Sequence, residues 1–301
     1  METSLPKITA LWAVNIITWN PTDEEFDDAL STISAYERER ICQLRIKEQA
    51  KASLIGRLLL LYLFNSIYNI QWEAIKFERT KENKPILASS VRLFIVLAGL
   101  SRTSSWYLTL LFLLSNQVFP DIGVRVDFNV SHHGDWVVLV ASENCRVGID
   151  VMKIEEPYNE NIETFLESLR EQLSKTEWDA ISAPDYPILK LHRFYRYWCL
   201  KESYIKAIGV GLAMSLKKLD FHIDESEGHE YGACNPVKTK TRLFVCGTFM
   251  AEWHFRELYL DELHCIAIAY ETNNDCINHR EFDSATIINI KDVLKKAVKV
   301  C

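Results

Sequence analysis

The chain has 301 residues, enough for one large or two medium-sized domains, because domains usually contain about 100–200 residues. Apolar residues make up 48% and charged residues 25%, as in an ordinary soluble globular protein. The formal net charge of −7 excludes a global positive field that would attract nucleic acid, so an anionic ligand would need a local cluster of lysines and arginines.

The eight cysteines are spread along the chain, with no Cys-x-x-Cys pair and no two histidines at ligand spacing. Zinc sites and redox dithiols need such close pairs, so neither is expected. The first residues, METSLPKITALW, lack the basic start and apolar run of a secretory signal, and the final residues do not fit a prenylation signal. We therefore expect reduced thiols and a cytosolic location.

The first part of the chain combines strand-like and helix-like patterns. Apolar residues that alternate with polar ones indicate strands, and apolar residues at helical spacing indicate helices. A strand, two helices, a second strand and a turn are predicted, in this order, at residues 11–18, 23–30, 34–68, 73–80 and 81–85.

An apolar segment, Val91–Phe119, interrupts this pattern. Its two apolar runs flank Ser101–Ser105, which contains Arg102. A membrane helix needs about 20 mostly apolar residues, and an arginine in mid-span costs about 2.5–3.5 kcal/mol. We therefore expect a buried hairpin or helix, and no membrane. The alternatives are a membrane span and a wrongly joined gene model.

The second part of the chain begins with three short β-rich runs and continues with helices and further strands. Strands are predicted at 126–131, 136–141, 146–152, 219–223, 241–246, 250–255 and 264–270, and helices at 162–173 and 188–208. Ser174 and Glu177 have the spacing of a capping box, and Gly209 stands where a helix should end. A last apolar-periodic segment ends at Val300. Long helices with clustered strands indicate an α+β fold.

Two short motifs carry residues suited to chemistry. In Val147–Met152 (VGIDVM), Asp150 stands among apolar strand residues, where a carboxylate is costly unless a cation or hydrogen-bond donors compensate it. In Trp198–Lys206 (WCLKESYIK), Glu202 and Lys206 share a helix face. Each motif alone also fits a plain structural role, as an Asx turn or a solvated ion pair.

Together the two motifs resemble the paired signatures of the 4′-phosphopantetheinyl transferase superfamily. These are a Gly-Ile-Asp strand and, some fifty residues later, Trp-x-x-Lys-Glu-Ser-x-x-Lys. Phe128–His132 (FNVSH) resembles the family's Asn-Val/Ile-Ser-His segment, and Lys201–Leu212 (KESYIKAIGVGL) is especially similar to its animal cytosolic members. Arg79-Thr80 and Lys84-Pro85 are similar to the family's basic turn before a proline. Thr286–Asn289 is similar to a segment near the family's C-terminus. The resemblance covers nearly the whole chain except residues 88–125.

The resemblance implies an enzyme that transfers the phosphopantetheine arm of coenzyme A, with Mg²⁺, to a serine of an acyl or peptidyl carrier protein. Asp150 and Glu202 would be the magnesium ligands, and Glu202, directly or through water, the general base. Lys201 and Lys206 would neutralise phosphate charge. The residues that would hold the nucleotide phosphates or line the same site are Arg40, Arg79, Lys84, Asn129, Val130, Ser131 and His132.

The resemblance also implies an α+β fold of two similar halves, related by a pseudo-twofold, with the active site in the cleft between them. We expect an N-terminal half at 1–143, with an unusual insert near 88–125, a C-terminal half at 144–275 and a tail at 276–301. We expect a monomer that acts on carrier domains of the fatty acid synthase, aminoadipate reductase or formyltetrahydrofolate dehydrogenase type.

Two positions depart from the family pattern. Met152 replaces an acidic residue that many bacterial members carry, and its thioether cannot bind Mg²⁺, so water would fill that place. Asn83 stands where closer relatives tend to have glycine. Three alternatives stay open: a non-catalytic relative that binds coenzyme A or carrier protein, a membrane-associated protein that uses residues 91–114, and another Mg²⁺-dependent phosphate enzyme.

Overall fold

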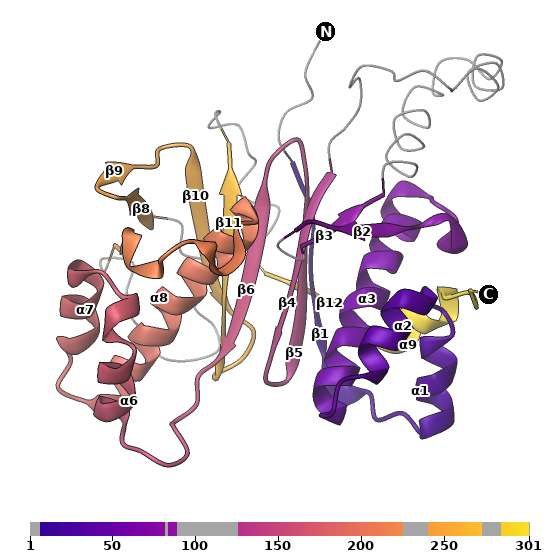
Figure 1. Ribbon diagram of the computed structural model, residues 1–301, viewed down its shortest axis with the longest axis horizontal. Coiled ribbons are helices and arrows are strands. Elements are labelled where there is room, and N and C mark those ends of the chain that lie inside the picture. The colour runs from indigo at the N-terminus through magenta and orange to yellow at the C-terminus, as the bar shows by residue number, and fades with distance from the viewer. Residues whose placement is uncertain (1–6, 82–83, 89–125, 225–239, 273–283, 301) are drawn as a thin grey trace, which may run out of the picture.

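The computed structural model describes residues 7–81, 84–88, 126–224, 240–272 and 284–300. The described elements form four layers, in which two β-sheets lie side by side in the middle and helices cover the outer face of each (Figure 1). Three apolar clusters fill the spaces between these layers. The combination of elements is α+β, as predicted from the sequence.

The first sheet has the strand order β12-β1-β5-β4. Its strands are β1 (Lys7–Asn15), β4 (Val126–His133), β5 (Trp136–Glu143) and β12 (Thr286–Ile287). Strand β5 is buried on both faces, because Val137, Leu139 and Ala141 pack against the helices while Val138 and Val140 face the second sheet. This alternation follows from the two-residue period of a strand.

The helices on the outer face of the first sheet come from both ends of the chain. They are α1 (Asp23–Leu30), α2 (Ala35–Cys42), α3 (Lys47–Tyr68) and, from the C-terminal segment, α9 (Ile290–Lys296). The hairpin of β2 (Phe77–Arg79) and β3 (Pro85–Leu87) crosses the upper end of this half in Figure 1. The turn was predicted at 81–85, between these two strands, and residues 82 and 83 of it lie outside the described residues.

The prediction of one continuous helix over 34–68 is wrong. The structure has two helices, α2 and α3, separated by residues 43–46. In a continuous helix, Glu37 and Arg57 would lie about 30 Å apart, at 1.5 Å per residue. Instead, the Arg57 Nη2 and Glu37 Oε1 atoms are 2.6 Å apart, because the break folds α2 back against α3.

The second sheet has the strand order β10-β11-β6. Its strands are β6 (Val147–Lys153), β10 (Trp253–Tyr259) and β11 (His264–Glu271), and its helices are α6 (Ile162–Ser168), α7 (Lys175–Ser182) and α8 (Pro187–Ile208). A further small sheet contains β7 (Leu219–His222), β8 (Arg242–Val245) and β9 (Thr248–Phe249). The predicted capping box at Ser174 and Glu177 is confirmed. So is the helix end at Gly209, which has φ of 72° and therefore favours glycine.

Several other predicted boundaries were displaced by short 3₁₀ turns. The strand predicted at 11–18 ends at Asn15, because the Asn15 side chain accepts a hydrogen bond of 3.0 Å from the Ile17 N–H and starts a turn. The 3₁₀ turns are η1 (Ile16–Thr18), η2 (Trp72–Ala74), η3 (Arg170–Gln172), η4 (Gly211–Ala213) and η5 (Leu216–Lys218). The strand expected at 250–255 begins only at Trp253.

The edge strands of the two sheets, β4 and β6, meet along what we call the β4–β6 seam. Here side chains of β4, rather than its carbonyl groups, accept hydrogen bonds from backbone N–H groups of β6. The three pairs, each separated by 20 residues, are Asp127 with Val147 at 2.9 Å, Asn129 with Ile149 at 3.5 Å and His133 with Lys153 at 2.8 Å. The seam thus satisfies edge N–H groups that would otherwise be left buried without partners.

The apolar insert and Asn83 lie outside the described residues, so the expectations for them stay predictions. Within the described part, α3 is long and apolar enough to cross a membrane by length and composition alone. However, 67% of its most apolar window is buried inside the protein. Since the core helix of a folded domain passes the same test, α3 is evidence for a core and not for a membrane span.

Close packing of β6 on α8 leads to a first prediction. A Cβ atom added at Gly148 would lie 2.2 Å from the Ser203 carbonyl oxygen and 2.4 Å from the Ala207 nitrogen, both backbone atoms of α8. Gly148→Ala should therefore lower the free energy of unfolding by about 3 kcal/mol or more, at the upper end of overpacking effects. Urea unfolding followed by circular dichroism measures this loss.

Gly247→Ala is the matched control for this variant. Gly247 has φ of +81° but nothing within 4 Å of its added Cβ, so alanine should cost only backbone strain, about 1 kcal/mol. Equal losses in the two variants would show that β6 and α8 can separate at little cost.

Candidate active site

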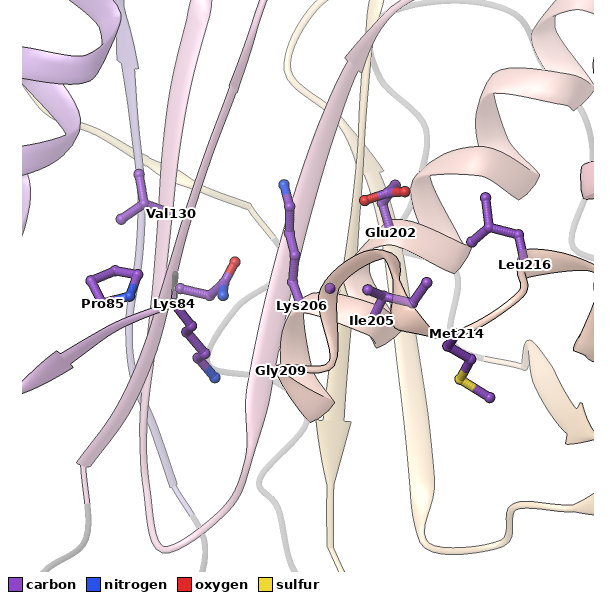
Figure 2. A pocket seen from close by; sticks show the side chains of 11 residues that line it. Lys84, Pro85, Val130, Glu202, Ile205, Lys206, Gly209, Met214 and Leu216 are labelled. Atoms are coloured by element: carbon purple, nitrogen blue, oxygen red, sulfur yellow. The ribbon is translucent and has the colours of Figure 1, made fainter. Parts of the chain in front are cut away.

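A pocket with a cavity volume of about 350 Å³ lies between the two halves of the chain. Figure 2 shows its lining residues, with Glu202 and Lys206 of α8 across from Lys84 and Pro85. From the N-terminal part of the chain the lining residues are Lys84, Pro85, Asn129 and Val130, and from the C-terminal part Glu202, Ile205, Lys206, Gly209, Gly211, Met214 and Leu216. Both halves therefore contribute to this pocket.

Three elements converge on Asp150 beside the pocket. The Lys206 Nζ atom of α8 lies 2.6 Å from Asp150 Oδ1 of β6 and 2.7 Å from the Ser131 Oγ atom of β4. The Ser131 hydroxyl donates to the same Asp150 oxygen at 2.8 Å. Asp150 Oδ2 is buried and has no hydrogen-bond partner among the described residues. A buried carboxylate oxygen without a partner can bind a cation or accept a hydrogen bond from a ligand.

Glu202 is electrostatically coupled to Asp150. Burial raises the pKa of Glu202, the negative charge of Asp150 raises it further, and Lys206 lowers it. Two carboxylates that repel one another are stabilised by a cation between them. Among the described residues, no group of three or more His, Cys, Asp or Glu side chains gathers as a metal site. Asp150 and Glu202 therefore fit a hard cation such as Mg²⁺ only if other oxygen ligands come from substrate and water.

Arg40 and Arg79 lie in what we call the arginine cluster, in which three guanidinium groups surround the buried Glu37 carboxylate. The distances to Glu37 oxygens are 3.0 Å from Arg40 Nε, 2.6 Å from Arg57 Nη2 and 2.9 Å from Arg79 Nη2. Burial opposes ionisation of Glu37, but Arg57 and Arg79 hold its pKa below the usual value. Burial lowers the pKa of Arg57 to about 10.

Sequence reasoning missed Glu37 and Arg57. The sequence did indicate a buried ion pair at Arg57, because this arginine is the only charged residue in the apolar run Leu54–Leu63 and a buried arginine needs a partner. Glu37 gave no comparable signal, since it begins a run of alternating charges that also fits a solvated helix.

Two further predicted site residues, His132 and Lys84, have charged neighbours. Burial lowers the pKa of His132, and the charges of Lys206, His133 and Arg40 lower it further. Both Lys206 at the pocket and Arg40 of the arginine cluster therefore act on His132. The Lys84 Nζ atom lies 3.1 Å from Asp127 Oδ1, which holds it at the pocket wall.

The prediction that Lys201 neutralises phosphate charge is wrong. Its side chain is fully buried away from the pocket, and its Nζ atom lies 2.8 Å from Glu177 Oε2, which is also fully buried. It donates further hydrogen bonds to the carbonyl oxygens of Leu216 and Leu219. Adjacent residues of a helix point about 100° apart, so Lys201 faces the core while Glu202 faces the pocket. Lys201 thus fixes α8 to its neighbours.

Comparison with known proteins agrees with the fold and the pocket. A sequence model of the 4′-phosphopantetheinyl transferase superfamily matches residues 146–269, and one of the 4′-phosphopantetheinyl transferase N-terminal domain matches residues 17–97. The chain belongs to the 4′-phosphopantetheinyl transferase superfamily and is a transferase of that family. The family uses coenzyme A and acts on carrier-protein domains.

The chain is also similar to individual proteins of this family. The chain is 33% identical, over 297 residues, to the L-aminoadipate-semialdehyde dehydrogenase-phosphopantetheinyl transferase of Homo sapiens, covering 95% of this chain and 85% of the human protein. It is 29% identical to the phosphopantetheinyl transferase of a Thraustochytrium species, covering 88% and 80% of the two chains. It is 25% identical to the 4′-phosphopantetheinyl transferase of Bacillus subtilis, covering 68% and 72%.

The corrected role of Lys201 gives a second prediction. Lys201→Met should lower the free energy of unfolding by about 3–5 kcal/mol, because it leaves Glu177 buried without a countercharge. The affinity of the folded variant for coenzyme A should be unchanged, because Lys201 lies outside the pocket. Urea unfolding and isothermal titration measure the two effects.

Lys175→Met is the control, since the Lys175 side chain is 93% exposed and its loss should change stability by less than about 0.5 kcal/mol. If Lys201→Met kept its stability and lost coenzyme A binding, the sequence-based role would be right after all.

Proposed function

We propose that this chain transfers 4′-phosphopantetheine from coenzyme A to the hydroxyl of a serine in a carrier-protein domain, in a reaction that requires Mg²⁺. The observation that carries the proposal is that Glu202 and Lys206 line one pocket, while Asp150 is paired with Lys206 and its charge acts on Glu202. Coenzyme A is heavily anionic, and two lysines, Lys84 and Lys206, line this pocket in a chain of net charge −7.

Asp150 and Glu202 would hold the magnesium ion. Carboxylate oxygens are the ligands that Mg²⁺ prefers, and the unpaired Oδ2 of Asp150 is available to it. When bound, the ion supplies positive charge next to the pyrophosphate oxygens. The Met152 side chain offers no oxygen, so water and substrate would have to supply the other ligands.

The basic residues would bind and orient coenzyme A. Lys206 neutralises charge at the pyrophosphate, and Arg40, Arg79, Lys84 and His132 hold the nucleotide phosphates. Asn129, Val130 and Ser131 shape the wall of the site, where Ser131 keeps Lys206 and Asp150 in place. Such positioning with fixed positive charge is the main source of rate in phosphoryl transfer.

The transfer itself follows from this arrangement. The carrier serine oxygen attacks the β-phosphorus in line and forms a new P–O bond, while the P–O bond to the bridging oxygen breaks. Adenosine 3′,5′-bisphosphate leaves with that oxygen. Glu202 accepts the serine proton, directly or through an intervening water.

The carrier protein is proposed from the relatives. The animal relatives are named for L-aminoadipate-semialdehyde dehydrogenase, so a carrier domain of the aminoadipate reductase type is our first candidate. Carrier domains of fatty acid synthase and of formyltetrahydrofolate dehydrogenase offer the same serine chemistry. We further propose that the enzyme acts as a monomer in the cytosol.

Replacement of the proposed base tests this function. Glu202→Gln should lower the transfer rate by at least about 10²-fold, because it removes the proton acceptor and one metal ligand. The measurement is the mass of an apo carrier domain after incubation with coenzyme A and Mg²⁺, where transfer adds one phosphopantetheine.

Glu160→Gln, at an exposed position, is the control and should transfer at the wild-type rate. Full turnover by Glu202→Gln would refute the role of Glu202, and no mass gain with the wild-type enzyme on any of the three carrier types would refute the proposed function.

A further inference from the structure

The arginine cluster contains a feature that phosphate binding by Arg40 and Arg79 does not explain. Glu37, a carboxylate, stands at the centre of a group proposed to bind anions. Its side chain is 7% exposed, whereas those of Arg40 and Arg79 are 35% and 19% exposed. Arg40 and Arg79 can therefore reach a ligand, and Glu37 lies behind them.

Glu37 directs its oxygens at the arginines. Oε1 accepts from Arg57 Nη2 at 2.6 Å and from Arg79 Nη2 at 2.9 Å, and Oε2 accepts from Arg40 Nε at 3.0 Å and from Arg79 Nη2 at 3.3 Å. A carboxylate offers about four acceptor positions, so these contacts fill it. Glu37 is thus occupied by the protein and acts on a ligand only through the arginines.

Arg57 lies deepest in the cluster. Its side chain is 5% exposed, and its guanidinium group packs over the Phe77 ring at 4.8 Å from the centroid. The Nε and Nη1 atoms of Arg57 are buried without hydrogen-bond partners among the described residues. Arg57 therefore contributes fixed charge from behind rather than a contact at the surface.

We propose that Glu37 is a positioning residue, which together with Arg57 holds Arg40 and Arg79 in a fixed array for a phosphate group of coenzyme A. This inference rests on the proposed function. A free arginine loses side-chain entropy when a ligand fixes it, and here the protein fixes it before the ligand arrives.

The charge of the cluster supports this assignment. Three guanidinium groups and one carboxylate leave a surplus of two positive charges. A phosphomonoester, such as that on the ribose of coenzyme A, carries about −1.5 to −2 charges at pH 7. Without Glu37, three guanidinium groups would repel one another and turn apart. The carboxylate therefore sets both the spacing and the charge of the array.

Two variants test the role of Glu37. Glu37→Gln weakens the contacts between residue 37 and the arginines. The double variant Glu37→Met with Arg57→Met removes these contacts and leaves no buried charge without a countercharge, so that the fold is kept. The measurements are the Kd for coenzyme A and for dephospho-coenzyme A by isothermal titration, and kcat and KM with an apo carrier domain.

Both variants should raise the Kd and KM for coenzyme A at least tenfold, while kcat at saturating coenzyme A stays within twofold. The Kd for dephospho-coenzyme A, which lacks the phosphomonoester, should change less than twofold. Glu39→Gln, on an exposed position of the same helix, is the matched control and should match the wild type.

The inference is overturned if the folded variants bind coenzyme A like the wild type, or if both ligands weaken equally, as a merely structural role would require. Arg79→Ala separates this failure from that of the proposed function. If Arg79→Ala weakens coenzyme A binding and the Glu37 variants do not, the positioning role alone is wrong. If Arg79→Ala also has no effect, the assignment of the cluster to phosphate is wrong, and the positioning role with it.

Discussion

The β4–β6 seam is the constraint on which the rest of the structure depends. The side chains of Asp127, Asn129 and His133 on β4 each accept a hydrogen bond from the backbone N–H group that lies 20 residues further along the chain, on β6, so the two sheets are held in one register. Ser131 lies within this series, and its hydroxyl binds the Asp150 side chain instead of a backbone group. The seam therefore brings the Asp150 carboxylate of β6 against Ser131 of β4, next to the β4 residues that line the pocket.

Helix α8 completes the site because it packs directly on β6. The close approach at Gly148 leaves no room for a side chain, and the Lys206 ammonium group of α8 reaches Asp150 across this contact. The buried ion pair of Lys201 and Glu177 fixes the opposite face of the same helix. Glu202, one residue along, is thereby presented to the pocket from a rigid element, which catalysis by positioning requires.

Sequence patterns predicted the features that depend on local order. The helix ending at Gly209, the capping box at Ser174 and the strand around Asp150 follow from periodicity and capping rules, and the structure confirms them. The shared face of Glu202 and Lys206 also follows from helical spacing, and both line the pocket.

Features that depend on tertiary packing could not be predicted in the same way. No glycine or proline marks the break at residues 43–46, which is favoured by packing of α2 on α3 and not by the local sequence. The motif that contains Lys201 does not reveal which side of α8 faces the core, so Lys201 was assigned to the wrong side. The partners of Glu37 are 3, 20 and 42 residues away, and only the folded chain brings them together.

The claim that Asp150 and Glu202 hold one metal ion is tested most directly by locating that ion. Anomalous diffraction from Mn²⁺ in crystals grown with coenzyme A would locate a divalent cation independently of activity. One peak is expected within ligand distance, about 2.0–2.2 Å, of a carboxylate oxygen of Asp150 and of Glu202. A peak bound elsewhere, or one that touches neither carboxylate, would contradict the claim.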